Sequence, residues 1–242
     1  MIRLNWVSTD DDFPPISNCL DEPNGLIAAS EGLDPAQILR AYRRGIFPWY
    51  SDPEPVLWWC PNPRMVLASE ELKISKSFAK VTRQIHRENR WHVTTDTAFA
   101  AVIANCAGPR RTQSGTWITS ALARAYTALH TQGFAHSIEV WDGDDLIGGL
   151  YGLCIGQMFY GESMFSLRPE ASKIALVALV DYLVLNKCPV IDCQQNTAHL
   201  TSMGGKSIAR DQFLELLDRY CEAERFDWVA GPLPFPLRQA NR

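Results

Sequence analysis

The sequence predicts an α+β fold in which a small N-terminal domain, residues 1–64, packs on a larger domain, residues 65–242. Three observations predict this. The chain has 242 residues, 46% of them hydrophobic, which is enough for one large core with a small appendage. Prolines and tryptophans crowd the segment before residue 64. After it, segments with helical and strand-like periodicity alternate.

The N-terminal domain contains one clear helix. Asp34 is a suitable N-cap, Pro35 occupies the first helical position, and Gly45 ends the helix. We expect its inner face to carry Ile38, Leu39 and Tyr42.

The segment that follows reads GIFPWYSDPEPVLWWCPNPR. Its prolines exclude long regular structure, while its phenylalanine and tryptophans offer large apolar surfaces. We expect a packed, irregular wall here, and we place the domain boundary at its end, near Arg64.

The larger domain has helical periodicity at about 75–89, 96–106, 119–132, 170–186 and 210–222. Residues 136–165 read as three antiparallel strands, with turns at Asp142-Gly143 and Ile155-Gly156. A short strand, VIDCQ, follows the fourth helix of this domain. The order of elements suggests an acyltransferase-like layer, but many other folds share it.

Composition excludes several classes of protein. The first residues contain no apolar signal region, and no apolar stretch approaches the roughly 20 residues that span a bilayer. The seven cysteines are scattered and mostly flanked by apolar residues, which is typical of reduced thiols in a core. We therefore expect a cytoplasmic protein without a membrane partner.

One segment departs from the net charge of −4. Residues 72–92 hold six Lys or Arg residues against one Glu, and four of these cations share a helical spacing: Lys76, Lys80, Arg83 and Arg87. The stripe is either an ordinary solvated face or, because like charges repel along it, a surface for an anionic backbone such as that of a nucleic acid.

Asp192 and Gln194 lie two residues apart in the short strand, so both side chains should point to one face. A carboxylate beside an amide can orient and polarise a nucleophile, and burial would favour Asp192 as a proton acceptor. The alternative is a structural Asp192 that caps a helix beginning near Asn196.

Glu162 is a single carboxylate among apolar groups. Strand alternation places it on one face with Met158, Tyr160 and Met164. It would either form a structural bridge to a nearby Lys or Arg, or recognise a polar or cationic group of a substrate.

Two tempting motifs fail. GGKS at residues 204–207 resembles the end of a phosphate-binding loop, but Leu200 stands where the pattern requires glycine. The cysteines and histidines show no paired metal-ligand spacing, so we expect neither a metal site nor a cofactor.

Ordered blocks run through nearly the whole chain: EPNGLIA (22–28), YRRGIFPWY (42–50), LWWCPNPR (57–64), GTWI (115–118), HSIEVW (136–141), GESMFS (161–166), IDCQ (191–194) and HLTSMGG (199–205). In this order they resemble the leucyl/phenylalanyl-tRNA-protein transferase family. The resemblance implies a catalytic domain similar to the GCN5-related N-acetyltransferases, but using aminoacyl-tRNA as donor. Gln195-Asn196 departs from the family's pattern, which has apolar residues there.

The resemblance also implies roles for residues. Trp49 and Trp117 match aromatics that hold the terminal adenosine of the tRNA, as unpaired bases commonly stack on aromatic rings. Glu162 and the pair Asp192 and Gln194 match polar groups of the reaction centre. The basic stripe would meet the acceptor stem. An apolar pocket for the transferred side chain would be lined by Leu150, Met158, Phe159, Leu176 and Ile191.

The implied reaction moves Leu, Phe or Met from tRNA to the N-terminal Arg or Lys of an acceptor protein, which is thereby marked for degradation by the N-end rule; we expect a monomer. Proximity would supply most of the rate, since an aminoacyl ester is already activated. Gln194, oriented by Asp192, would align the amine and help draw off its proton. It stays open whether Asp192 is a general base, or an orienter while the ribose hydroxyl shuttles the proton. An acetyl-coenzyme A N-acetyltransferase would need a glycine-rich loop where the chain has SLRPEASK. A non-enzymatic tRNA or peptide adaptor is the other alternative.

Overall fold

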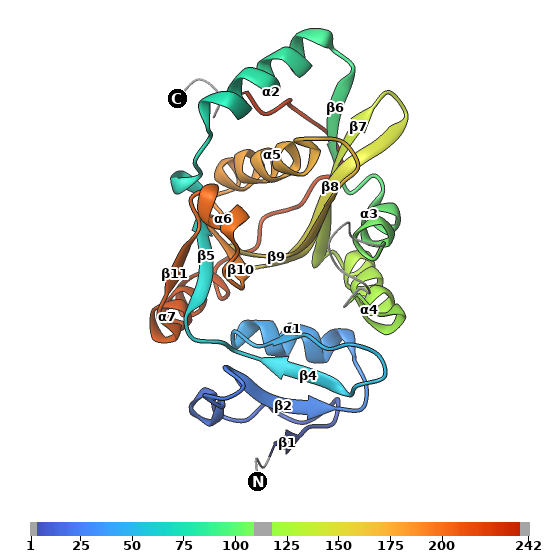
Figure 1. Cartoon of the computed structure of the whole chain (residues 1–242). Coiled ribbons are helices and arrows are strands. Elements are labelled where there is room, and N and C mark those ends of the chain that lie inside the picture. Colours follow the sequence, from blue (N-terminus) through green and yellow to red (C-terminus); the bar gives the residue numbers. More distant parts are fainter. Residues whose placement is uncertain (1–3, 109–117, 238–242) are drawn as a thin grey trace.

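The chain forms two β-sheets, of four and eight strands, in a computed structural model that describes residues 4–108 and 118–237. Figure 1 shows the smaller sheet at the bottom of the molecule and the larger sheet above it. The predicted α+β class, with a small N-terminal unit against a larger one, is confirmed.

The smaller sheet has the order β1-β2-β4-β3 and comprises β1 (Asn5–Trp6), β2 (Leu26–Ser30), β4 (Val56–Trp59) and β3 (Phe47–Pro48). Helix α1 (Pro35–Arg43) begins as predicted, because the Asp34 carboxylate accepts hydrogen bonds from the backbone N–H groups of Ala36 and Gln37. The proline-rich segment is not wholly irregular, since it forms the two short strands β3 and β4.

The larger sheet has the order β11-β5-β10-β9-β8-β7-β6-β12. The three predicted strands are β7 (Ala135–Asp142), β8 (Asp145–Ile155) and β9 (Met158–Ser166), and VIDCQ is β10 (Val190–Gln194). β10 pairs parallel to β9, while the other pairings in this sheet are antiparallel. Four strands were not predicted: β5 (Arg64–Ala68), β6 (Trp91–Thr95), β11 (Lys206–Ile208) and β12 (Gly231–Leu233).

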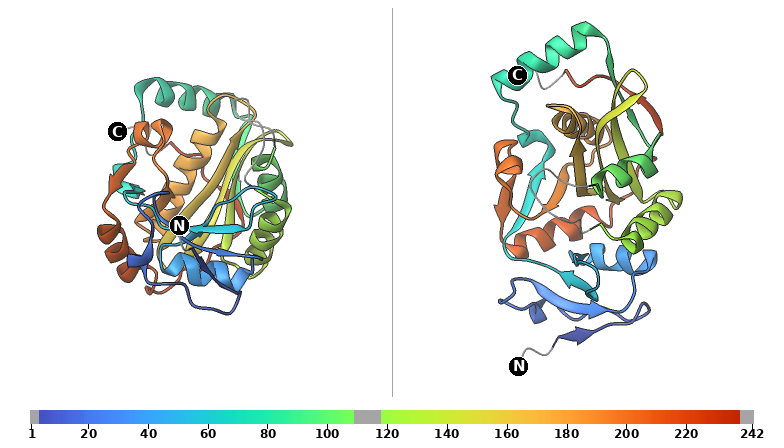
Figure 2. Two further views of the ribbon diagram at one scale, coloured as in Figure 1. Left: turned by 60° about the horizontal axis from the view of Figure 1, so that its bottom comes forward. Right: turned by 45° about the vertical axis from the view of Figure 1, so that its right-hand side comes forward.

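Helices cover both faces of this sheet. Figure 2 shows α5 (Ala171–Leu185) on one face, with α3 (Phe99–Cys106) and α4 (Ser120–Thr131) on the other. These helices, together with α2 (Lys76–Glu88) and α7 (Arg210–Tyr220), occupy the predicted ranges. The five-residue α6 (Ala198–Ser202) is the helix that the alternative for Asp192 expected to begin near Asn196.

The two units share one core. Tyr42 and Phe47 of the N-terminal unit belong to the same buried cluster as Phe99 of α3 and Tyr126 of α4. The chain leaves β4 at Trp59 and enters the large sheet at Arg64, the first residue of β5. A site placed between the units therefore has walls of fixed relative position.

Among the described residues, no helix combines the length and apolarity needed to cross a membrane. All seven cysteines are unpaired, and five of them are buried.

Candidate active site

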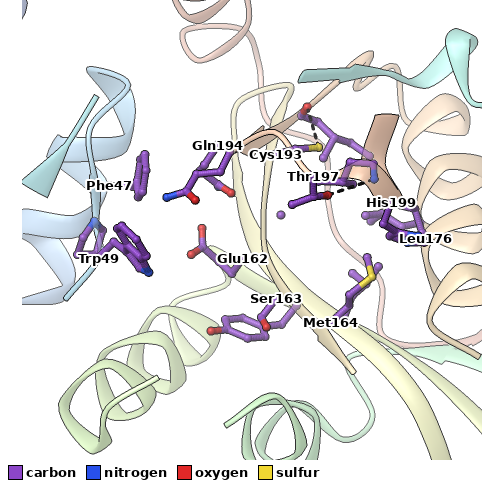
Figure 3. A pocket seen from close by; sticks show the side chains of 18 residues that line it. Phe47, Trp49, Glu162, Ser163, Met164, Leu176, Cys193, Gln194, Thr197 and His199 are labelled. Carbon is purple, nitrogen blue, oxygen red and sulfur yellow. Dashed lines mark hydrogen bonds between the residues drawn. The ribbon is translucent and has the colours of Figure 1, made fainter. Parts of the chain in front are cut away.

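A cavity of about 580 Å³ opens between the N-terminal unit and the strand pair β9 and β10. Figure 3 shows aromatic side chains of the N-terminal unit at one end, polar groups in the middle and apolar side chains of the large domain at the other end. The lining residues are Phe47, Pro48, Trp49, Leu150, Tyr151, Gly161, Glu162, Ser163, Met164, Leu176, Leu179, Ile191, Cys193, Gln194, Gln195, Thr197, His199 and Leu200.

Glu162 reaches the cavity from a β-bulge. Gly161 of β9 pairs with Gly152 and Ser163 pairs with Tyr151, so Glu162 is the extra residue opposite two consecutive residues of β8. A bulge bends its strand and redirects the side chain of the unpaired residue. It also changes which face of the sheet the following side chains point to. Tyr160, before the bulge, packs in the core that the two units share, whereas Met164, after it, packs against the cluster that contains α5. The expectation that Met164 shares the face of Glu162 is therefore wrong.

Two tyrosine hydroxyls hold the Glu162 carboxyl group. Tyr42 Oη donates to Oε1 at 2.7 Å, Tyr126 Oη donates to Oε2 at 3.0 Å, and the two hydroxyls lie 2.8 Å apart. Three close oxygen contacts need three hydrogens, but two phenols supply only two. A protonated Glu162 supplies the third: it donates to one tyrosine hydroxyl, that hydroxyl donates to the other, and the second tyrosine donates back to the carboxyl group.

Burial raises the pKa of Glu162 from 4.5 to about 7, although the two tyrosine hydrogen bonds act in the opposite direction. Burial also raises the pKa of Tyr42 and of Tyr126, so both remain protonated donors. A carboxyl group that titrates near neutral pH can both accept and return a proton, as general acid–base catalysis requires. Neither alternative considered for Glu162 foresaw tyrosine partners.

Asp192 does not line the cavity. Its carboxylate is fully buried and accepts two hydrogen bonds from Arg64, from Nε at 2.8 Å and from a terminal guanidinium nitrogen at 2.6 Å. Arg64 is itself fully buried between the rings of Phe47 and Phe213, at 4.7 and 4.5 Å from their centroids, and donates to the Gly45 carbonyl. The capping alternative is wrong, because Thr197 caps the following helix.

Gln194 does line the cavity, and a second bulge separates it from Asp192. Asp192 pairs with Val66 while Gln194 pairs with the adjacent Met65, which leaves Cys193 as the extra residue. Gln194 also has a φ of +55°, a left-handed conformation that is rare for a residue with a side chain. The Asp192 carboxylate stabilises this turn by accepting the Gln194 backbone N–H at 2.9 Å. Strand alternation predicted that both side chains point to one face. In the structure only Gln194 lines the cavity, so this prediction is wrong.

The Gln194 amide nitrogen is buried and has no hydrogen-bond partner among the described residues. An unsatisfied buried donor costs free energy unless a ligand pairs with it. The Nε2 atom of His199, at the apolar end, is in the same situation, and burial lowers the pKa of this histidine. A substrate with an acceptor oxygen near Gln194 would supply the missing hydrogen-bond partner of its amide nitrogen.

The apolar end contains three of the five expected pocket residues, Leu150, Leu176 and Ile191. Met158 and Phe159 do not line it and are fully buried elsewhere. They lie at the start of β9. Met158 is four residues from Glu162, which at about 3.3 Å per residue is about 13 Å along the strand. Met164, Leu179 and Leu200 line the cavity in addition.

Trp49 stands at the aromatic end with 42% of its surface exposed. Its backbone carbonyl accepts a hydrogen bond from Trp59 Nε1 at 2.7 Å, and the two rings meet edge to face at 5.8 Å. An exposed, braced indole is suited to stack against a flat ring system. Trp117 lies outside the described residues.

The basic stripe lies on α2, at the end of the molecule opposite the N-terminal unit in Figure 1. Its four cations are exposed, and the buried residues of α2 are Phe78, Ala79 and Thr82. A depression of about 440 Å³ lies on this helix, lined by Lys80, Arg83, His86, Arg87 and Leu237.

Sequence reasoning missed the residues that hold the site together. Arg64 is 128 positions from Asp192, and Tyr42 is 120 positions from Glu162. Tyr42 reads as an ordinary core residue of its helix. Arg64 carried a signal only as a cation within an otherwise apolar strand segment, RMVLA.

Comparison with known proteins found two family models that match this chain. A family model described as leucyl/phenylalanyl-tRNA protein transferase matches residues 66–218, and one described as the N-terminal domain of that transferase matches residues 31–62. The leucyl/phenylalanyl-tRNA–protein transferase of Pseudomonas paraeruginosa is 50% identical over 233 residues, covering 96% of this chain and all of the relative. That of Paraburkholderia xenovorans is 49% identical over 228 residues, covering 93% of each chain.

Among solved structures, the L-PGS of Bacillus licheniformis is similar over 71% of this chain and 54% of its own. The sequence identity is 8% and the TM-score is 0.38, a level from which we draw no conclusion.

Proposed function

Because the chain belongs to the leucyl/phenylalanyl-tRNA–protein transferase family, we propose that it transfers Leu, Phe or Met from aminoacyl-tRNA to the N-terminal Arg or Lys of an acceptor protein. The single observation that supports the cavity as the site of this reaction is the position of Glu162, between an aromatic end and an apolar end. Such a product is a substrate for degradation by the N-end rule, as the family implies.

The donor would lie along the cavity. The terminal adenosine stacks on Trp49, and the transferred side chain enters the apolar end beside Leu150, Leu176 and Ile191. This places the ester carbonyl in the middle, next to Glu162 and Gln194. The buried amide nitrogen of Gln194 then donates to the carbonyl oxygen, on which negative charge develops during attack.

The acceptor's neutral α-amine attacks the ester carbon. A carbon–nitrogen bond forms, the bond from the carbonyl carbon to the ribose oxygen breaks, and the amine loses one proton. Glu162 accepts this proton in its ionised form and returns it to the leaving ribose oxygen, assisted by the hydroxyls of Tyr42 and Tyr126. Its pKa of about 7 is suited to both steps.

Asp192 acts in this scheme as an orienter. Both carboxylate oxygens face Arg64, and one also accepts the backbone N–H of Gln194. It therefore fixes the conformation from which Gln194 points into the cavity, rather than taking a proton from substrate.

The acceptor stem would lie on α2. Its cationic stripe supplies the charge that an RNA backbone needs, so the net charge of −4 does not count against a tRNA partner. Donor and acceptor of this kind occur in the cytoplasm, where we propose that the protein acts as a monomer.

A transfer assay tests the proposal. Radiolabelled leucyl-tRNA is mixed with two acceptors that differ only in an N-terminal Arg or an N-terminal Ala, and incorporation is expected in the first alone. Binding of charged tRNA without incorporation would instead identify an adaptor. Transfer from acetyl-coenzyme A but not from leucyl-tRNA would identify an acetyltransferase.

A further inference from the structure

The C-terminal segment of the described chain crosses the large domain to reach α2. We call residues 224–237 the strap. Figure 1 shows it as the dark red trace that runs from the β6 side of the sheet towards α2. The reaction scheme above uses no residue of the strap.

The first half of the strap is firmly anchored. Trp228 stacks on His136 at 4.0 Å with an interplanar angle of 8°, and its Nε1 donates to Thr95 Oγ1 at 2.8 Å. The Val229 N–H donates to the Tyr182 hydroxyl at 3.0 Å. Strand β12 then pairs antiparallel with β6, from which the chain would not detach without breaking the sheet edge.

Helix α2 is anchored unevenly. Its buried residues, Phe78, Ala79 and Thr82, all lie in its N-terminal half. In the C-terminal half, Ile85 is half-buried and the remaining residues are exposed. Two of the four cations of the stripe, Arg83 and Arg87, lie in this less anchored half.

The strap supplies contact to this half. The ring of Phe235 stacks on His86, with centroids 5.4 Å apart and an interplanar angle of 28°. Leu237 lines the depression on α2 with Lys80, Arg83 and Arg87. Figure 1 accordingly shows the end of the strap beside α2.

We propose that the strap positions the RNA-binding surface: Phe235, through its stack on His86, holds the C-terminal half of α2 so that Arg83 and Arg87 meet the phosphates of the acceptor stem. This inference rests on the proposed function. Arg83 and Arg87 contact the RNA, whereas Phe235 acts through them and is a positioning residue. Its contribution concerns the tRNA body and leaves the chemistry at Glu162 unaffected.

The test compares two donors on the full chain, leucyl-tRNA and 3′-leucyl-adenosine, which lacks the acceptor stem. For Phe235→Ala we expect the KM for leucyl-tRNA to rise by about fivefold, the effect of weakening one or two phosphate contacts. The kcat with leucyl-tRNA and both constants with 3′-leucyl-adenosine should stay at the wild-type values. Phe235→Tyr keeps a stacking ring and should restore the KM.

The salt dependence gives a second readout that a purely structural role would not change. Each lost phosphate contact lowers the slope of log affinity against log salt concentration by about 0.9, so Phe235→Ala should lower it by about 1 to 2. Val229→Ala is the matched control, because Val229 is 68% exposed on the same strap and its hydrogen bond, made by its backbone N–H, goes to Tyr182 of α5 and not to α2. It should change neither the KM nor the slope.

Three outcomes are distinguishable. An unchanged KM for leucyl-tRNA and an unchanged salt slope in Phe235→Ala would overturn the inference. An equal loss with both donors would also overturn it, since the strap would then support the fold and not the RNA surface. Failure of the wild-type protein to use either donor would instead refute the proposed function.

Discussion

Replacing Glu162 with glutamine should abolish most of the activity and yet make the protein more stable at pH 8. Glutamine keeps the shape of the side chain but cannot accept a proton from the amine. General acid–base catalysis contributes about 10²- to 10⁴-fold, so kcat/KM for leucine transfer should fall within that range. The wild-type rate should rise with pH through about 7, as Glu162 ionises, whereas the variant should keep only the rise at about pH 8 that comes from deprotonation of the acceptor's α-amine.

The gain in stability follows from the direction of the pKa change. Below pH 4.5 the carboxyl group is protonated in both the folded and the unfolded state. As the pH rises from 4.5 to about 7, the unfolded chain loses the proton first, and the folded state becomes less stable. The full loss is reached above pH 7 and amounts to about 3 kcal/mol, at about 1.4 kcal/mol for each tenfold change in proton affinity.

Urea unfolding at pH 4.5, 6, 7 and 8 measures this. Wild type and Glu162→Gln should have similar free energies of unfolding at pH 4.5, and the variant should be more stable by up to about 3 kcal/mol at pH 8. The exposed Glu31→Gln variant is the control and should show no such divergence. A constant difference at every pH would refute the raised pKa, and near-normal transfer would refute Glu162 as proton acceptor.

Five further variants test the surroundings of Glu162. Arg64→Leu should destabilise the fold by about 3–5 kcal/mol because it leaves Asp192 as an uncompensated buried charge. The double variant Arg64→Leu/Asp192→Leu should recover most of that stability in urea unfolding while transfer stays low. Trp49→Ala should raise the KM for the minimal donor 3′-leucyl-adenosine, since stacking of one base contributes about 1–3 kcal/mol, and Trp49→Phe should raise it less. Leu176→Phe should narrow the apolar end and lower kcat/KM for phenylalanine more than for leucine.

Each of these has a contrary result. Normal transfer by the stable double variant would show that Asp192 does not orient Gln194 for the reaction. An unchanged KM in Trp49→Ala would place the adenosine elsewhere. Equal effects of Leu176→Phe on both amino acids would show that the transferred side chain lies outside the apolar end.

Local signals predicted the elements of regular structure well. Asp34, Pro35 and Gly45 define α1 through contacts within a few residues, and the periodicity of 170–186 describes a helix of the right length. The edge strands β11 and β12 have three residues each and are held by pairing with distant strands, so no local pattern could reveal them.

The candidate site was harder to predict because two bulges redirect it. Alternation assumes one residue for each residue of the neighbouring strand, and this fails at Glu162 and at Cys193. The resemblance identified Glu162 and Gln194, which do line the cavity. It could not reveal that the Asp192 carboxylate forms an ion pair with Arg64, since the two residues come together only when the large sheet forms.

The hydrogen bond from Tyr42 to Glu162 has a consequence for the design of chimeras and for the evolution of the gene. The residue that would move the proton belongs to one sheet unit, and one of the two hydroxyls that hold it belongs to the other. A chimera that exchanges only the larger unit would therefore receive a reaction centre with a foreign wall and a foreign hydrogen-bond donor. Successful exchange between relatives should require both units from the same parent, and the two segments of the gene are expected to evolve as one functional module.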